Sequence, residues 1–168
     1  MNILITGSAG FIGFHLVRRL LKSSHNLICI DSLDTYYDVQ LKNSRLKLLK
    51  KENFKKNYHF YKVNILNKKK IFKIFEKKKI DTVIHLAAQA GVRYSLKNPD
   101  KYIKTNITGF FNIIEASKKF SIKHFIFASS SSVYGNSNKS SFSEQDRIDR
   151  PLQLYAATKI SDEAISYS

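Results

Sequence analysis

Two residues near the end of the 168-residue chain have the types and the spacing of an acid–base pair. Tyr155 and Lys159 are four residues apart, so on a helix they lie on the same face. A lysine ammonium beside a phenol favours the phenolate, which makes the tyrosine a usable general base near neutral pH. The same spacing is common on ordinary helix surfaces, so the assignment needs support from elsewhere in the sequence.

A run of four serines supplies that support. The serine run, Ser129 to Ser132, directly follows an apolar segment at 124–128 that predicts a strand. Hydroxyl groups at the end of a buried strand can hold the substrate oxygen whose proton the tyrosine removes. The alternative is a polar loop with no role in catalysis, which is less expected directly after a buried strand of this fold.

The first 22 residues predict a second kind of site, one for phosphates. An apolar run at 3–5 predicts a strand, glycines follow at Gly7, Gly10 and Gly13, and apolar residues then recur at helical spacing. A glycine loop lets the backbone approach a diphosphate, and the free amides of the first helical turn face the anion. The spacing is G-x-x-G-x-x-G rather than the usual dinucleotide fingerprint, and a glycine turn into an ordinary core helix is the alternative.

Asp31 favours the phosphate site. It ends a second apolar run at 27–30, near the interval at which dinucleotide-binding folds place a carboxylate for a ribose. Such a carboxylate accepts hydrogen bonds from ribose hydroxyls and repels a 2′-phosphate, so it selects NAD over NADP. An aspartate after a strand is also a common turn residue, and the pairing with the glycine loop therefore carries the inference.

The elements that must position these residues alternate between strand and helix. Strands are predicted at 3–5, 27–30, 58–63, 80–86 and 124–128, and helices at about 12–22, 39–51, 68–78, from 98 and from 154. We expect Asn98 and Pro99 to be the N-cap and first-turn residues of the fourth helix. Its apolar stripe is expected to consist of Ile103, Ile107, Phe110 and Ile114, widened by Phe111 and Ile113. The alternation predicts an α/β fold, a Rossmann-like doubly wound parallel sheet with helices on both faces.

Composition narrows the class of protein. Contents of 43% hydrophobic and 25% charged residues are ordinary for a soluble domain of this length. The single cysteine, Cys29, excludes a disulfide within the chain and fits a reducing compartment such as the cytoplasm. The N-terminal segment lacks the basic start of a signal peptide, and no apolar run approaches the length of about 20 residues that spans a membrane.

The net charge of +16 raises the question of an anionic partner. The lysines gather at 47–56, 68–70 and 77–79, and the last two groups flank the apolar face of an amphipathic helix. A base-stacking platform would interleave aromatic residues with the lysines. We therefore interpret the charge as mostly solvated surface and expect no nucleic-acid partner.

Taken in order along the chain, these motifs resemble a known family. The set consists of Gly7-x-x-Gly10-x-x-Gly13, Asp31, His85-Leu86-Ala87-Ala88, Asn106-x-x-Gly109, the serine run with Val133-Tyr134-Gly135, and Tyr155-x-x-x-Lys159. It is similar to the extended short-chain dehydrogenase/reductases of nucleotide sugars, the NAD-dependent epimerase/dehydratase family, over the whole chain. Residues 88–95 and 31–38 most resemble members that act on UDP-glucuronate at C4.

The resemblance implies roles for individual residues. Tyr155 would remove the proton of the sugar 4-hydroxyl while the C4 hydride passes to NAD and later returns to the opposite face. Ser130 and Lys159 would be the other catalytic residues, and Arg93, Ser130, Ser131 and Ser132 would contact the UDP-sugar. The implied cofactor-binding residues are Gly7, Gly10, Phe11, Ile12, Gly13, Asp31, Asn64, Ile65, Leu86, Ala87, Ala88, Asn106, Tyr155 and Lys159. No metal site is predicted.

Two parts of the sequence bear on the match to the family, one through the type of reaction and one through the binding of the adenine. Relatives that dehydrate or decarboxylate their sugar carry an acidic residue where this chain has Ser130 to Val133, and elimination needs that extra group. Asn64-Ile65 stands where the family usually has Asp-Ile beside the adenine, although Asn64 can still accept a hydrogen bond. The alternatives are a UDP-glucose or UDP-N-acetylglucosamine 4-epimerase, a nucleotide-sugar dehydratase, and a non-catalytic NAD- or RNA-binding protein.

Doubly wound dinucleotide folds use about six strands, and five are predicted here. Because the family also has longer chains, residues 1–168 are expected to form an incomplete, C-terminally truncated NAD-binding Rossmann domain without the smaller substrate-binding domain. The resemblance implies a homodimer in the full-length form, in which the apolar stripe and the final helix pack against the same helices of a second subunit.

Overall fold

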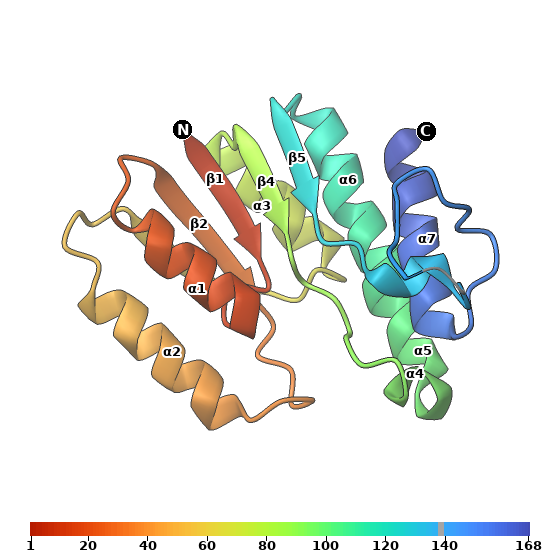
Figure 1. Cartoon of the computed structure of the whole chain (residues 1–168). Helices are drawn as coiled ribbons and strands as arrows, with labels where there is room; N and C mark the ends of the chain where they lie inside the picture. Colours follow the sequence, from red (N-terminus) through yellow and green to blue (C-terminus); the bar gives the residue numbers. More distant parts are fainter. Residues whose placement is uncertain (138–139) are drawn as a thin grey trace.

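In the computed structural model, which describes residues 1–137 and 140–168, five parallel strands form one sheet (Figure 1). The strands are β1 (Asn2–Thr6), β2 (Asn26–Asp31), β3 (Tyr58–Lys62), β4 (Thr82–His85) and β5 (His124–Phe127). Their order is β3-β2-β1-β4-β5, so the winding direction reverses between β1 and β4. Ile5 pairs with Cys29 on one side and with Ile84 on the other. The predicted Rossmann-like sheet is confirmed, and its switch point lies at the end of β1.

The helices follow the predicted pattern closely. They are α1 (Phe11–Leu20), α2 (Val39–Lys51), α3 (Lys68–Lys78), α4 (Tyr94–Lys97), α5 (Pro99–Tyr102), the π-helical η1 (Ile103–Gly109), α6 (Phe110–Lys119), the 3-10 turn η2 (Ser131–Tyr134) and α7 (Leu154–Tyr167). Side-chain caps fix two of the starts. Asp38 accepts a hydrogen bond from the amide of Gln40 at 2.7 Å, and Asn67 accepts one from Lys70 at 3.0 Å. The short helix α4 was not predicted.

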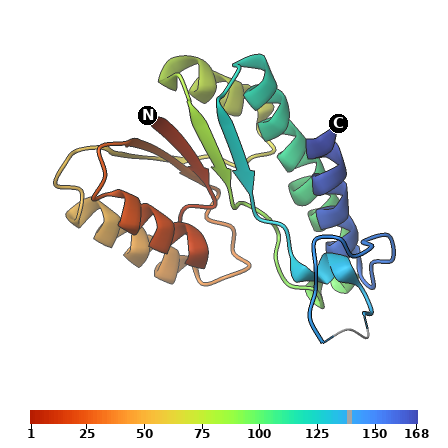
Figure 2. The ribbon, with the colours of Figure 1, turned by 45° about the horizontal axis from the view of Figure 1, so that its top comes forward.

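Alternate residues of each central strand enter two separate cores. Ile3 and Ile5 pack with α1 and α2, whereas Leu4 packs with α3 and α6 on the other face. Figures 1 and 2 show α1 and α2 on one side of the sheet and α3 and α6 on the other, with α7 beside α6. The prediction of helices on both faces is confirmed, and the carboxyl ends of β1, β2 and β4 are left open.

The predicted apolar stripe of the long helix is wrong. Phe110 is fully buried, Ile103 is 43% exposed, and Ile107 and Ile114 are half-buried, so the four do not share a face. The reason is the π-helical segment η1, whose i→i+5 hydrogen bonds widen the helix and change its phase. Of the predicted residues Phe110 and Ile113 are buried, and they share the buried face with Tyr102, Asn106 and Gly109.

The start of this helix also differs in detail from the expectation. Pro99 is its first residue, as predicted, but the side chain of Asn98 makes no capping hydrogen bond to it.

Among the described residues, no helix combines the length and the apolar character needed to cross a membrane.

Candidate functional site

The loop between β1 and α1 brings three stretches of backbone unusually close together. Gly7 has a φ of +69°, and a Cβ there would lie 2.8 Å from the backbone nitrogen of Ala87. A Cβ at Gly13 would lie 2.2 Å from the carbonyl oxygen of Gly7. Gly10 precedes α1 without a side-chain cap, so the first amides of the helix face outwards. This concave, amide-rich backbone fits a diphosphate group and leaves no room for side chains.

A cleft of about 470 Å³ opens from this loop across the carboxyl ends of the strands. Eleven of the predicted cofactor residues line it: Gly7, Gly10, Phe11, Ile12, Gly13, Asp31, Asn64, Ile65, Leu86, Ala87 and Ala88. The three other predicted cofactor residues, Asn106, Tyr155 and Lys159, lie outside its lining. The cleft occupies the switch point of the sheet, where doubly wound folds bind nucleotides.

Asp31 holds the glycine loop as well as facing the cleft. Its Oδ2 accepts a hydrogen bond from the amide of Ala9 at 3.0 Å, and its Oδ1 accepts one from Leu33 at 2.8 Å. Each carboxylate oxygen keeps a further lone pair, so the residue can still accept from a ribose hydroxyl. Two cations that the sequence analysis missed, Lys42 and Arg45, line the same cleft.

Asn64 and Ile65 occupy different environments at the other side of the cleft. Asn64 is exposed, and its Oδ1 accepts a hydrogen bond from the amide of Leu66 at 2.9 Å. Ile65 is 4% exposed and lies against Gly109, where a Cβ would come within 2.6 Å of its Cδ1. The amide side chain of Asn64 is therefore accessible at the cleft, while Ile65 forms part of its floor.

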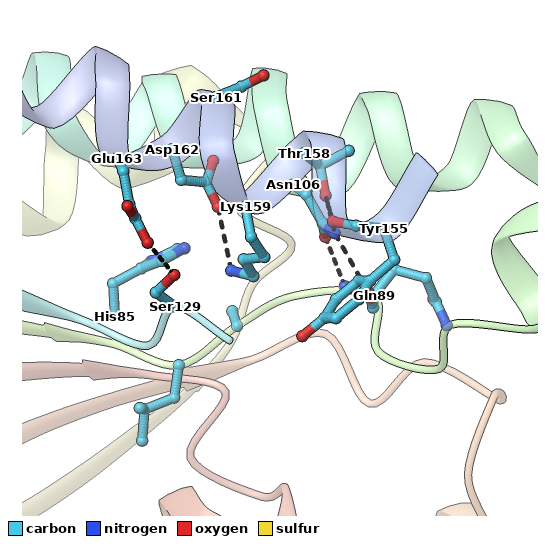
Figure 3. A network of polar contacts seen from close by, with 12 residues as sticks. His85, Gln89, Asn106, Ser129, Tyr155, Thr158, Lys159, Ser161, Asp162 and Glu163 are labelled. Atoms are coloured by element: carbon cyan, nitrogen blue, oxygen red, sulfur yellow. Dashed lines mark hydrogen bonds and ion pairs between the residues drawn. The ribbon is translucent and has the colours of Figure 1, made fainter. Parts of the chain in front are cut away.

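Asn106 links the segment after β4 to helix α7 (Figure 3). Its Oδ1 accepts from the amide of Gln89 at 2.7 Å, and its Nδ2 donates to the carbonyl of Gln89 at 3.2 Å and to Thr158 Oγ1 at 3.0 Å. Thr158 in turn donates to the carbonyl oxygen of Tyr155 at 2.7 Å. Gln89 lines the cleft, so this buried network fixes α7 relative to it.

Tyr155 and Lys159 lie on the same side of α7, the side that faces the strand ends in Figure 3. The ring of Tyr155 packs edge-to-face against Tyr102, with 6.2 Å between ring centroids. The Lys159 side chain is only 4% exposed, and its Nζ donates to Asp162 Oδ2 at 3.0 Å. The structure thus brings the predicted pair together on one helix face, with Asp162 as a third member.

The serine run lies beside α7, at the end of β5. Ser130 is the N-cap of η2, where its Oγ accepts from the amide of Ser132 at 3.2 Å and bonds the hydroxyl of Ser132 at 3.1 Å. Ser129 donates to the carboxylate of Glu163 on α7. Ser131 is exposed and Ser132 half-buried. Arg93 is exposed just before α4, on a different element from the serines.

Two buried titratable groups lie near this constellation. His85 Nδ1 is 2.9 Å from Thr6 Oγ1, and burial together with the charge of Lys159 lowers the pKa of His85 to about 3. Burial raises the pKa of Asp162 to about 6, against the lowering effect of Lys159. His85 is therefore a neutral structural residue, whereas Asp162 titrates within the working range of an enzyme. No group of three or more metal-ligating side chains occurs in the described part of the chain.

Sequence reasoning missed several of these contacts. Asp162 could have been found, because an acidic residue three positions after Lys159 lies on the same helix face. Thr6, Gln89 and Tyr102 act through partners distant in sequence, and nothing local marks them.

The chain is similar in sequence to one protein family and to several curated proteins. The family described as GDP-mannose 4,6 dehydratase matches residues 4–168. Protein CapI of Staphylococcus aureus is 51% identical over 168 residues, which are 100% of this chain and 49% of CapI. A UDP-glucuronate 4-epimerase of Thermodesulfobacterium geofontis is 46% identical over 166 residues, 98% of this chain and 50% of that protein. The chain thus spans about half the length of the curated relatives it matches.

Solved structures of similar proteins give the same fold. UDP-glucuronic acid 4-epimerase from Bacillus cereus, in complex with UDP-glucuronic acid and NAD, matches with a TM-score of 0.88 and 37% identity, over 99% of this chain and 51% of that one. UDP-glucose 4-epimerase from Thermotoga maritima, with UDP-glucose, matches with a TM-score of 0.83 and 34% identity, over 99% and 50%.

Proposed function

The chain belongs to the family described as GDP-mannose 4,6 dehydratase, and on that premise we propose that it is the NAD-binding half of a UDP-glucuronate 4-epimerase. The observation that carries the proposal is the placement of Tyr155 and Lys159 on the inner face of α7, tied by Asn106 and Thr158 to a glycine-lined cleft. A nucleotide site and an acid–base pair joined in this way suit an oxidation and reduction at one carbon of a sugar. The product would be UDP-galacturonate.

Each residue of the proposed active site has a separate role in the reaction. NAD, when bound, accepts the hydride of sugar C4 and gives it back. Tyr155 takes the proton of the 4-hydroxyl as the hydride leaves, and returns it when the 4-keto sugar is reduced on its other face. Lys159 favours the phenolate and holds the nicotinamide ribose, and Ser130 donates a hydrogen bond to the reacting sugar oxygen. Proton and hydride each leave and return, so no net redox change occurs.

Epimerisation is favoured over dehydration by the serine run. Elimination of water from a sugar needs a further acid–base group, and residues 130–132 offer only hydroxyls. A UDP-glucose 4-epimerase is the second candidate, because the Thermotoga maritima enzyme has nearly the same fold over this half. Arg93 and the hydroxyls of Ser131 and Ser132 favour a carboxylate-bearing sugar.

A substrate panel tests this choice. In a protein where residues 1–168 are continued by the second half of the family's length, UDP-glucuronate and UDP-galacturonate should interconvert about tenfold or more faster than UDP-glucose and UDP-galactose. Arg93→Leu should reduce the preference for the uronate sugars over the neutral sugars, because the sugar carboxylate loses the cation proposed to bind it. Equal or higher kcat/KM on the neutral sugars would assign the protein to the second candidate.

Cofactor preference tests the role of Asp31. The protein should bind NAD at least about tenfold more tightly than NADP, since the carboxylate repels a 2′-phosphate. Asp31→Asn should reduce this ratio, as measured by titration with each cofactor. Asp81→Asn is the control, because Asp81 lies before β4 at the opposite end of the sheet and bonds the amide of Asn2. Tighter binding of NADP by the unmodified protein would contradict the assignment.

The rest of the enzyme is part of the proposal. β5 lies at the edge of the sheet, and its Ile126 is 44% exposed, which suits coverage by further strands and a sugar-binding domain. Phe111 on α6 is 48% exposed and suits a homodimer contact through α6 and α7. We place the enzyme in the cytoplasm, without a nucleic-acid partner, because its single cysteine is free and its lysines are spread over solvated helices.

A further inference from the structure

A buried ion pair stands behind the proposed active site. Lys159 Nζ donates to Asp162 Oδ2 at 3.0 Å, and the two side chains are 4% and 1% exposed. The second carboxylate oxygen, Oδ1, is buried without a hydrogen-bond partner among the described residues. Burying a carboxylate with one oxygen unpaired costs desolvation free energy. The contact with the Lys159 ammonium is the interaction in the structure that offsets this cost.

The charges around Asp162 define when this pair is neutral. On α7, Lys159 attracts the carboxylate and Glu163 repels it, and burial raises its pKa to about 6. From β4, His85 lies near Lys159 but is uncharged above about pH 3. From η1, the uncharged Asn106 faces α7 through Thr158, and Ser129 after β5 holds Glu163. Asp162 is therefore the group of this pair that changes charge near pH 6.

Resting on the proposed function, we propose that Asp162 is a positioning residue that neutralises Lys159 and so sets the relative affinity for oxidised and reduced cofactor. The oxidised nicotinamide ring carries a positive charge, and the reduced ring does not. An unpaired ammonium beside the ring favours the reduced form, whereas a neutral Lys159–Asp162 pair does not discriminate against the oxidised form. The second arrangement suits a reaction that begins and ends with oxidised NAD.

The test is a pair of binding titrations on the full-length protein. Dissociation constants for NAD and NADH are measured from pH 5 to pH 8 in the wild type and in Asp162→Asn. At pH 8 the variant should show a ratio of the NAD to the NADH dissociation constant about tenfold higher than the wild type, the usual size of one lost charge. In the wild type the same rise should appear as pH falls through about 6, because Asp162 is then protonated. The variant should show no such change with pH.

Glu163→Gln is the matched control. It removes the same charge from the next residue of α7, but that carboxylate is bonded to Ser129 rather than to Lys159. It should keep the rise of the ratio at low pH, with the midpoint moved to lower pH because Glu163 no longer repels the Asp162 carboxylate. A residue with a merely structural role would change thermal stability and leave the cofactor ratio alone.

The outcomes separate the two proposals. A wild-type ratio that is constant from pH 5 to pH 8 overturns the role of Asp162, even where Asp162→Asn fails to fold. An unchanged ratio in a folded Asp162→Asn variant does the same. Cofactor binding without epimerisation overturns the proposed function while leaving this inference standing, and a wild type that binds neither cofactor form overturns both.

Discussion

Tyr155→Phe in the full-length protein is expected to lower the rate of epimerisation by about 10²–10⁴-fold while leaving NAD bound. The substitution removes the phenolic oxygen and keeps the ring, so the packing against Tyr102 survives. In the proposed mechanism the hydroxyl is needed only to take and return the proton of the sugar. Turnover of UDP-glucuronate and the NAD content of the purified protein, measured together, separate lost chemistry from lost binding.

The matched control is Tyr102→Phe. Its ring lies next to that of Tyr155, and its hydroxyl donates to the carbonyl oxygens of Ala90 and Gly91. Burial raises the pKa of Tyr102 to about 12, so it does not exchange protons near neutral pH. We expect this variant to lose some stability and to keep turnover within about tenfold of the wild type. A Tyr155→Phe rate within threefold of the wild type would remove Tyr155 from the mechanism.

The features that the sequence predicted correctly are those encoded by local patterns. Alternating apolar runs gave the five strands and the helices between them, and the glycine spacing located the loop after β1. Asp31 stands at the end of β2, where the interval from the glycine loop placed it. Local propensity and parallel-sheet topology together bring such residues to one edge, so no knowledge of side-chain contacts was needed.

The features that escaped prediction depend on long-range contacts or on helix geometry. The link from Gln89 through Asn106 to Thr158 joins segments that are far apart in sequence, and each of these residues is unremarkable alone. The apolar stripe was wrong because a period of 3.6 residues does not describe a π-helical segment. Ile103 consequently faces solvent, and Phe110 enters the core.

Gly13→Ala is expected to weaken NAD binding by about 100-fold, or about 2.7 kcal/mol. A Cβ at this position would lie 2.2 Å from the oxygen of Gly7 and 2.9 Å from Ser8 Cα. These are backbone atoms, so no flexible side chain can yield, and α1 must move away from the glycine loop. The movement would open the concave backbone that we propose holds the diphosphate of NAD. Overpacking of this kind also costs about 1–3 kcal/mol of stability.

Gly10→Ala provides the graded comparison, because the same methyl group would meet the Gly7 oxygen at 3.1 Å, a distance that a small shift relieves. Its NAD dissociation constant should rise less than about tenfold. NADH fluorescence titration gives the affinities, and thermal unfolding of each variant without cofactor shows how much of the effect is loss of stability. If Gly13→Ala folds and binds NAD within threefold of the wild type, the close contact between α1 and the loop is not what shapes the diphosphate site. We expect the NAD dissociation constant to be highest for Gly13→Ala, lower for Gly10→Ala and lowest for the wild type. This order follows the closeness of the added Cβ to the Gly7 oxygen, as a close contact between α1 and the glycine loop requires.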